Sequence, residues 1–73
     1  MSHRFTVILE AEPAGGFSVF CPALKGCHSE SETEEEAMSN IQEAAELYLE
    51  SLHAHGEAIP LEDLKVRSLA VAL

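Results

Sequence analysis

Residues 26–52 read GCHSESETEEEAMSNIQEAAELYLESL, and this stretch decides the fold because it holds the longest periodic apolar pattern in the chain. Thr33 is the expected N-cap of a helix, with Glu36 three residues later in the capping-box position. Glu residues at 34–36 fill the first turn, where the helix dipole favours negative charge. Gly56 is the expected stop. The pattern predicts one amphipathic helix of roughly 22 residues, about 33 Å long.

The apolar residues of this helix recur at spacings of three and four. They are Ala37, Met38, Ile41, Ala44, Ala45, Tyr48, Leu49 and Leu52. At 100° per residue they form a single stripe about 140° wide, with mostly Glu, Ser and Gln on the other side. A helix with one face to bury requires a surface, which the rest of the chain has to supply.

Strand patterns lie on both sides of this helix. Residues 4–12 alternate with a period of two, and the turn chemistry of residues 13–16 should bring residues 17–21 back antiparallel. Residues 27–30 allow a short third strand. Residues 64–73 (LKVRSLAVAL) predict a last strand, whose final five positions are all apolar and therefore indicate burial on both faces.

The order strand, strand, strand, helix, strand predicts one α+β domain over residues 1–73. A right-handed crossover would place the last strand parallel to the first, in the sheet order 3-2-1-4. The helix covers either the more apolar face, which bears Leu9 and Val19, or the opposite face, and periodicity leaves both open. The last strand would lie at an edge. We therefore expect a homodimer or higher oligomer that uses Leu69, Val71 and Leu73.

The charge of the chain favours a basic partner. The net charge is −9, and eleven acidic residues but no Lys or Arg lie between Gly26 and Leu64. Such a field disfavours nucleic acid and favours a basic protein, although a solubilising helix face gives the same composition. Two cysteines without a signal peptide or a long apolar run predict a cytoplasmic protein with reduced thiols and no membrane span.

The sequence offers little that would support catalysis. Cys21, Cys27 and His28 match no common zinc spacing, and strand alternation sends the last two to opposite faces. No nucleophile is paired with a base, and no glycine-rich phosphate loop is present. His53 and His55 suit a capping role at the helix C-terminus. We therefore expect no catalytic residue, no metal and no cofactor.

Specific segments resemble the HicB antitoxin family. The run CPALKGCHS at residues 21–29 is followed by TEEEA at residues 33–37, and the likeness continues through GEAIP at residues 56–60. It covers residues 4–60. The resemblance implies a partial ribonuclease-H-like βββαβ domain without ribonuclease activity. It also implies a partner, the small basic toxin HicA, which cleaves mRNA through a catalytic His on a double-stranded-RNA-binding-type fold.

The family's mode of action implies a contact surface. Neutralisation would cover the toxin's RNA-binding surface and present carboxylates to its basic residues. Leu47 lies off the apolar stripe, either as an ordinary exposed leucine or as a partner contact rimmed by carboxylates. The motif positions are mainly those that a turn and a core require. We expect toxin contacts at His28, Glu30, Glu32, Glu34 and Leu47.

Two departures from the family pattern affect the interpretation. Many relatives carry a C-terminal helix-turn-helix or ribbon-helix-helix module that binds operator DNA, and residues 1–73 leave no room for one. Ser31 stands where relatives often have Gly. The chain is thus expected to be a minimal antitoxin or an orphan of that family. The alternatives are a small structural homo-oligomer with no toxin and, third, a degenerate nuclease or metal-binding domain.

Overall fold

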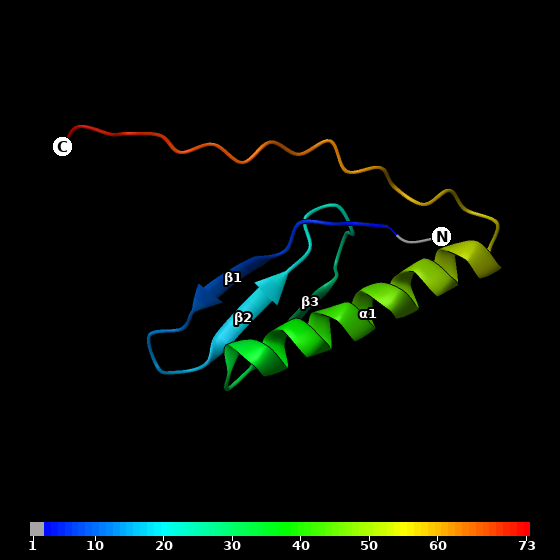
Figure 1. The fold of residues 1–73 in the computed structure, drawn as a ribbon, viewed down its shortest axis with the longest axis horizontal. Coiled ribbons are helices and arrows are strands. Elements are labelled where there is room, and N and C mark those ends of the chain that lie inside the picture. Colours follow the sequence, from blue (N-terminus) through cyan, green and yellow to red (C-terminus); the bar gives the residue numbers. More distant parts are fainter. Residues whose placement is uncertain (1–2) are drawn as a thin grey trace.

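A computed structural model describes residues 3–73 of the chain (Figure 1). Three strands, β1 (Ile8–Ala11), β2 (Phe17–Phe20) and β3 (His28–Ser31), precede one helix, α1 (Glu34–Ala54). The strands form an antiparallel sheet in the order β1-β2-β3, and α1 packs against β2 and β3. This confirms the α+β class, with three strands followed by one long helix in a single small domain.

A glycine-rich hairpin connects β1 to β2. Gly15 and Gly16 have φ angles of 104° and 85°, which glycine adopts without the steric cost that a Cβ brings. The Glu12 N–H donates to the Gly16 carbonyl at 2.9 Å and closes the turn. A Cβ on Gly16 would lie 2.8 Å from the Ser31 carbonyl oxygen. Gly16 therefore serves both the turn and the close approach of the segment that follows β3.

The first strand is shorter than its sequence pattern. We expected residues 4–12, but only Ile8–Ala11 pair. Phe20, the last residue of β2, pairs with Ile8, and the chain then turns away. Residues 4–7 thus have no β2 backbone beside them, although their alternation continues.

The loop between β2 and β3 is a compact turn with its own core residue. The Cys21 N–H donates to the Cys27 carbonyl at 3.0 Å, and the Cys27 N–H donates to the Leu24 carbonyl at 3.0 Å. Leu24 is 0% exposed, and Gly26 has a φ of 80°. The loop buries Leu24 beneath the sheet and starts β3 at His28, one residue later than expected.

The helix begins where its sequence predicts. Thr33 is the N-cap, and its Oγ1 accepts from the Glu36 N–H at 3.1 Å. The acidic first turn of α1 places its charge next to the remaining free N–H groups. The helix runs for 21 residues, close to the expected length. Within residues 3–73, no helix has both the length and the apolar content that crossing a membrane requires.

The helix ends in a Schellman motif. Gly56 has a φ of 68°, and its N–H donates to the His53 carbonyl at 3.1 Å. The Glu57 N–H donates to the Leu52 carbonyl at 2.8 Å. The expected stop at Gly56 is confirmed, and both ends of the helix are satisfied by local backbone chemistry.

The core lies between α1 and the more apolar face of the sheet, which settles the choice left open by periodicity. Val19 and Ile41 are each 1% exposed, and Ala37 is fully buried where the helix approaches the sheet. Leu9 and Phe17 pack against this cluster from the sheet. One layer of helix thus covers one face of the sheet.

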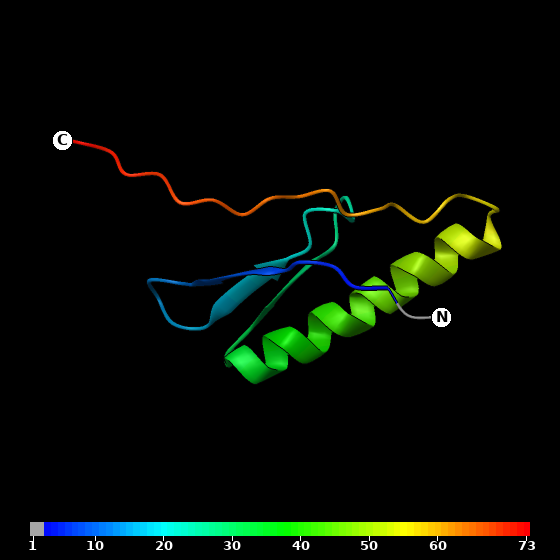
Figure 2. The same cartoon turned by 45° about the horizontal axis from the view of Figure 1, so that its top comes forward.

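The C-terminal segment corrects the expected topology. No strand is formed by residues 64–73 within the described chain, so the order 3-2-1-4 is wrong for the single chain. The segment leaves the helix end and runs past the sheet as an extended trace (Figures 1 and 2). The Cα radius of gyration is 14.4 Å, against about 11 Å for a compact chain of this length. Leu69 and Val71, expected to be buried on both faces, are 85% and 76% exposed.

Candidate functional site

We call residues 8–56, which form the sheet and the helix, the body of the protein. The sheet face opposite α1 is the most distinctive surface of this body. Antiparallel register places one row of side chains, Ile8, Phe20 and His28, on this face, and the next row is Glu10, Ser18 and Glu30. We call these six residues the outer face. In the described chain no secondary-structure element packs over it, because α1 lies on the other side.

Strand alternation decides which side chains reach the outer face. Val19 is 1% exposed on the core side, whereas its neighbour Phe20 is 37% exposed on the outer face. Ile8 is exposed to a similar extent. The two side chains are paired across β1 and β2 and so form an apolar centre.

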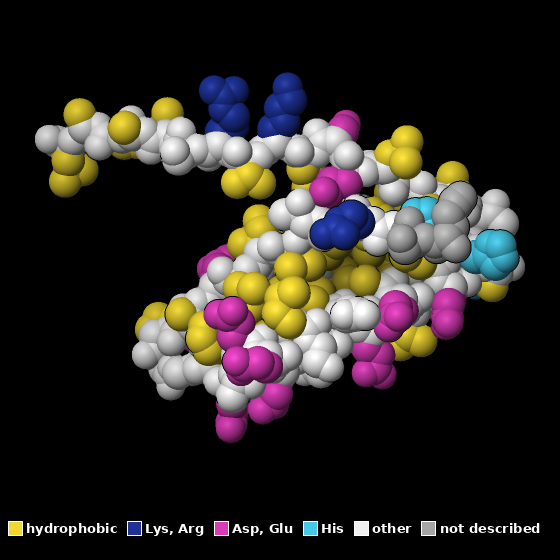
Figure 3. Space-filling view, viewed as in Figure 1, with side chains coloured by type: hydrophobic (Ala, Val, Ile, Leu, Met, Phe, Trp, Pro, Cys, Tyr) yellow, Lys and Arg dark blue, Asp and Glu magenta, His cyan; other side chains and the backbone are white. Residues whose placement is uncertain are grey.

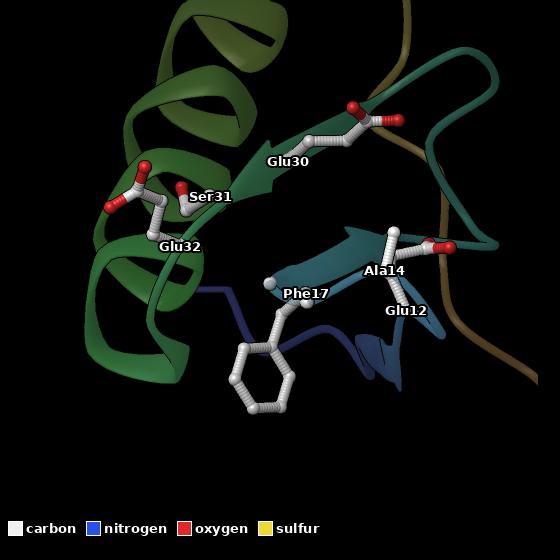
Figure 4. Close-up of a pocket in the computed structure, with 8 residues that line it drawn as sticks. Glu12, Ala14, Phe17, Glu30, Ser31 and Glu32 are labelled. Atoms are coloured by element: carbon white, nitrogen blue, oxygen red, sulfur yellow. The ribbon is translucent and has the colours of Figure 1, made fainter.

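Carboxylates border this apolar centre. Glu10 and Glu30 flank Ser18 in the adjacent row, and both are exposed. Glu12 and Glu32 lie just beyond the strand ends, where they line a hollow of about 540 Å³ together with Glu30. Figure 4 shows their side chains pointing in different directions around this hollow. No Lys or Arg belongs to the outer face or to the lining of the hollow.

The separation of these carboxylates bears on the chemistry available. Within residues 3–73, no three His, Cys, Asp or Glu residues come close enough to hold a metal ion. Carboxylates that point apart suit contacts with several separate cations, such as the Lys and Arg side chains of a protein. The arrangement therefore favours protein recognition at this face.

The expected toxin-contact residues fall into two groups. His28 and Glu30 lie on the outer face, and Glu32 borders the hollow. Glu34 and Leu47 are on α1, on the other side of the sheet. These five residues therefore do not form one continuous surface around a single centre.

Leu47 nevertheless lies on the flank of α1 that faces β3. The Asn40 side-chain amide donates to Ser31 Oγ at 2.7 Å, which turns that flank of α1 toward β3. Leu47 is seven residues further along the same flank, about 10.5 Å at the helical rise. Its side chain is 59% exposed. A partner that wraps around the β3 edge would reach both groups.

Sequence reasoning missed Ile8, Phe20, Glu10 and Glu12. The signal was present in the strand patterns, because each of these residues alternates with one expected on the core side. What the pattern lacks is the register that brings Ile8 beside Phe20. Only pairing between strands supplies that information.

Cys21, Cys27 and His55 have structural positions, in the core and at the end of the helix. Cys21 and Cys27 are free and buried. Burial raises the pKa of the Cys27 thiol above its ordinary value, and the neighbouring Cys21 raises it further, so this thiol stays protonated at neutral pH. His55 fulfils its expected capping role, because its Nδ1 donates to the Ser51 carbonyl at 2.7 Å.

The residues of the sequence motif have identifiable positions in the fold. Leu24 and Cys27 are core residues, and Gly26 takes the positive φ that its turn requires. Thr33 caps α1, and Ala37 permits close packing of the helix on the sheet. The motif therefore encodes a turn, a cap and a core.

A three-stranded antiparallel sheet with one long helix packed on one face defines the class of the protein. The family model described as the HicB-like antitoxin of bacterial toxin-antitoxin systems matches residues 5–71. The chain belongs to this family. The match extends well beyond the helix and includes most of the C-terminal segment.

Similar proteins carry the family name UPF0150. One from Synechocystis sp. is 54% identical over 69 residues, which are 94% of this chain and 87% of that protein. Another, from Thermoplasma acidophilum, is 42% identical over 60 residues, which are 82% of this chain and 87% of that protein. A second Synechocystis protein is 30% identical over 72 residues, and the match covers almost all of that protein.

Proposed function

We propose that this chain is an antitoxin that binds a small basic toxin of the HicA type and masks its RNA-binding surface. The outer face and the neighbouring carboxylates form the contact, extending around the β3 edge to Leu47. The role is one of binding, without a catalytic step. It is exerted in the cytoplasm, where the two thiols remain reduced.

The composition of the outer face supports this proposal most directly. Ile8 and Phe20 give a half-exposed apolar centre, and carboxylates border it. An apolar centre with a charged rim is the usual anatomy of a protein interface. The six residues of the outer face include two carboxylates and no Lys or Arg, and this charge attracts a basic partner and repels phosphate. Lys25 lies beside the face, where it lines a hollow with Phe20 and His28.

Masking requires only position and charge. Glu30 and Glu32 would pair with cations that the toxin otherwise offers to the RNA backbone. Phe20 would be buried against the toxin and contribute the area that holds the complex together. Both effects block substrate access without any change in the toxin's catalytic group.

The test is a charge-neutralising triple variant, Glu30→Gln, Glu32→Gln and Glu34→Gln. A matched control, Glu46→Gln, Glu57→Gln and Asp63→Asn, removes the same number of charges at exposed positions outside the proposed contact. Affinity is measured by calorimetry at several salt concentrations. The titrant is the purified product of a short basic reading frame, which is to be sought beside the gene for this chain. We expect the first variant to bind at least about tenfold more weakly with a flatter salt dependence, and the control to change little.

A second variant tests the apolar centre. Phe20→Ala should weaken toxin binding by about tenfold or more while leaving the helical circular dichroism signal intact, because Phe20 is outside the core. Unchanged affinity in both the triple variant and Phe20→Ala would place the contact elsewhere on the chain.

The exposed C-terminal segment favours a second candidate, a small structural homo-oligomer that has no toxin partner. The two candidates differ in a direct observation. If the basic titrant does not bind at any salt concentration and the chain forms a stable oligomer, this second function is favoured.

A further inference from the structure

Two segments of the chain have strand patterns but no strand partner. Residues 4–7 continue the alternation of β1 beyond the end of β2. Residues 64–73 have a strand pattern that ends in five apolar positions, and all ten residues are exposed. β1 is also an edge strand of the described sheet, so its outer side is open. An open edge beside an unpaired apolar segment is a site for strand addition.

A side-chain contact brings the start of the C-terminal segment to this edge. Thr6 Oγ1 donates to Glu62 Oε2 at 2.9 Å, and the Thr6 N–H donates to Glu62 Oε1. The two residues are 56 positions apart in the chain. The chain after Glu62 therefore starts from a point that is held by Thr6, two residues before β1.

The length of the segment would carry its last residues beyond its own sheet. If the chain ran parallel to β1 from this anchor at a constant separation of 56, Arg67 would lie opposite Ala11, the last residue of β1. Residues 69–73 would then extend past the hairpin. Both ribbon views show the chain end lying beyond the hairpin along the long axis (Figures 1 and 2). The most apolar part of the segment thus lies where its own body offers no surface.

Charge indicates what covers the segment. Residues 64–73 contain Lys65 and Arg67 and no acidic residue, whereas residues 1–63 contain thirteen acidic residues and two cations. In Figure 3 the Lys and Arg side chains of the C-terminal segment stand apart from the Asp and Glu side chains of the body. A basic toxin would repel this segment, but the acidic body of another copy attracts it. β1 contains Glu10, and Glu12 follows its last residue directly.

We propose that two copies of the chain exchange residues 64–73, each segment pairing with the β1 edge of the other copy. The exchange gives each sheet a fourth strand beside β1, supplied by the second copy. It buries Leu69, Val71 and Leu73 between the two bodies, and the two-fold symmetry satisfies both edges at once. The family match extends to residue 71, so the segment is part of the family domain.

The first experiment measures the oligomeric state of the full chain alone by sedimentation velocity from 1 to about 100 μM. The wild type should be a dimer. The double variant Leu69→Ser, Val71→Ser should dissociate at least about tenfold more readily, because it removes two buried apolar side chains without changing the charge. The control Leu47→Ser, Leu61→Ser alters two leucines that are also exposed and outside the segment, and it should remain dimeric.

A second experiment distinguishes exchange from simple pairing of the two C-terminal segments. Chains carrying Glu10→Cys are mixed with differently tagged chains carrying Ser68→Cys and treated with a bismaleimide. Both positions are exposed, whereas Cys21 and Cys27 are buried and give the background in the wild type. Exchange predicts cross-links between the two kinds of chain.

Three outcomes would overturn the proposal. A wild type that stays monomeric at all concentrations removes the dimer. A dimer that the Leu69 and Val71 substitutions leave unchanged places the interface elsewhere. Cross-links only between two Ser68→Cys chains show that the segments pair with each other. No toxin is present in these measurements, so their result is independent of the proposed antitoxin function.

Discussion

The body and the C-terminal segment of this protein contrast in how their apolar residues are satisfied. Between Ile8 and Gly56, each strand has a neighbour, both helix ends are capped, and Val19 and Ile41 are buried. After Glu62 the chain is richer in Leu and Val than the body is, yet these side chains are exposed. The comparison shows that an apolar strand pattern specifies a need for burial without naming the surface that meets it.

The contrast also separates stability from association. Substitutions in the body should change the free energy of unfolding of the single chain. Substitutions in the segment should change the dissociation constant between chains. The following predictions test that separation, beginning with the largest expected effect.

Ile41→Ala should lower the free energy of unfolding by about 2–5 kcal/mol, because it leaves a cavity between α1 and the sheet where Ile41 is 1% exposed. A domain this small has only about 3–5 kcal/mol from its core, so the variant is expected to be largely unfolded. Urea denaturation followed by circular dichroism measures the loss. Leu69→Ala, measured in dilute solution, is the counterpart in the C-terminal segment. If it lowers the free energy of unfolding as much as Ile41→Ala does, the two regions do not differ in the way we propose.

Gly56→Ala should cost about 1 kcal/mol. The φ of 68° is costly for any residue with a Cβ, whereas the added methyl group would meet no other atom within 4 Å. Thermal unfolding measures the cost. Gly56→Asn should lose less, because Asn tolerates this backbone conformation. Equal losses for the two variants would mean that the Schellman geometry does not set the cost.

Glu62→Ala should destabilise the chain by about 1 kcal/mol or less, because the two hydrogen bonds to Thr6 are only partly buried. Its clearer effect is local. The Thr6 amide should exchange faster with deuterium, while amides in β2 keep their protection. Asp63→Ala, a change at the exposed neighbouring residue, is the control. Unaltered exchange at Thr6 would remove the anchor on which the placement of the C-terminal segment depends.

The smallest effect concerns pH. Burial raises the pKa of Cys27 above its ordinary value of 9.0, so the folded state holds this proton more tightly than the unfolded state does. The resulting stabilisation is complete below about pH 9 and is lost as the pH rises through the folded pKa. Cys27→Ala should therefore show a shallower loss of stability between pH 8 and 11 than the wild type. Identical slopes would show that burial of this thiol has no energetic consequence.

Local chemistry explains how much of the body could be predicted. The Thr33 cap, the Gly56 stop and the hairpin at Gly15 and Gly16 each depend on residues close together in the chain. Helical periodicity then identified the apolar stripe of the helix, and strand periodicity separated the two faces of β2 without deciding which of them α1 covers. These features hold because steric and hydrogen-bonding preferences act within a few residues.

Pairing explains what could not be predicted. Residues 4–7 have the alternation of a strand, but β2 ends too early to reach them. The outer face brings Ile8, Phe20 and His28 together across 20 positions of sequence. Of this row, only His28 was among the expected toxin contacts. Register between strands was the missing quantity, since it depends on the whole hairpin and not on any single segment.

By itself, the sequence determined a capped amphipathic helix, a glycine hairpin, an acidic surface and a C-terminal run that has to be buried. These follow from short-range sterics, from periodicity and from charge, which are written in the chain residue by residue. The tertiary structure alone decided which face the helix covers, which side chains form the outer face, and that the last residues extend beyond their own sheet. Those outcomes depend on register and on the reach of the chain from a fixed anchor, which arise only when segments distant in sequence meet.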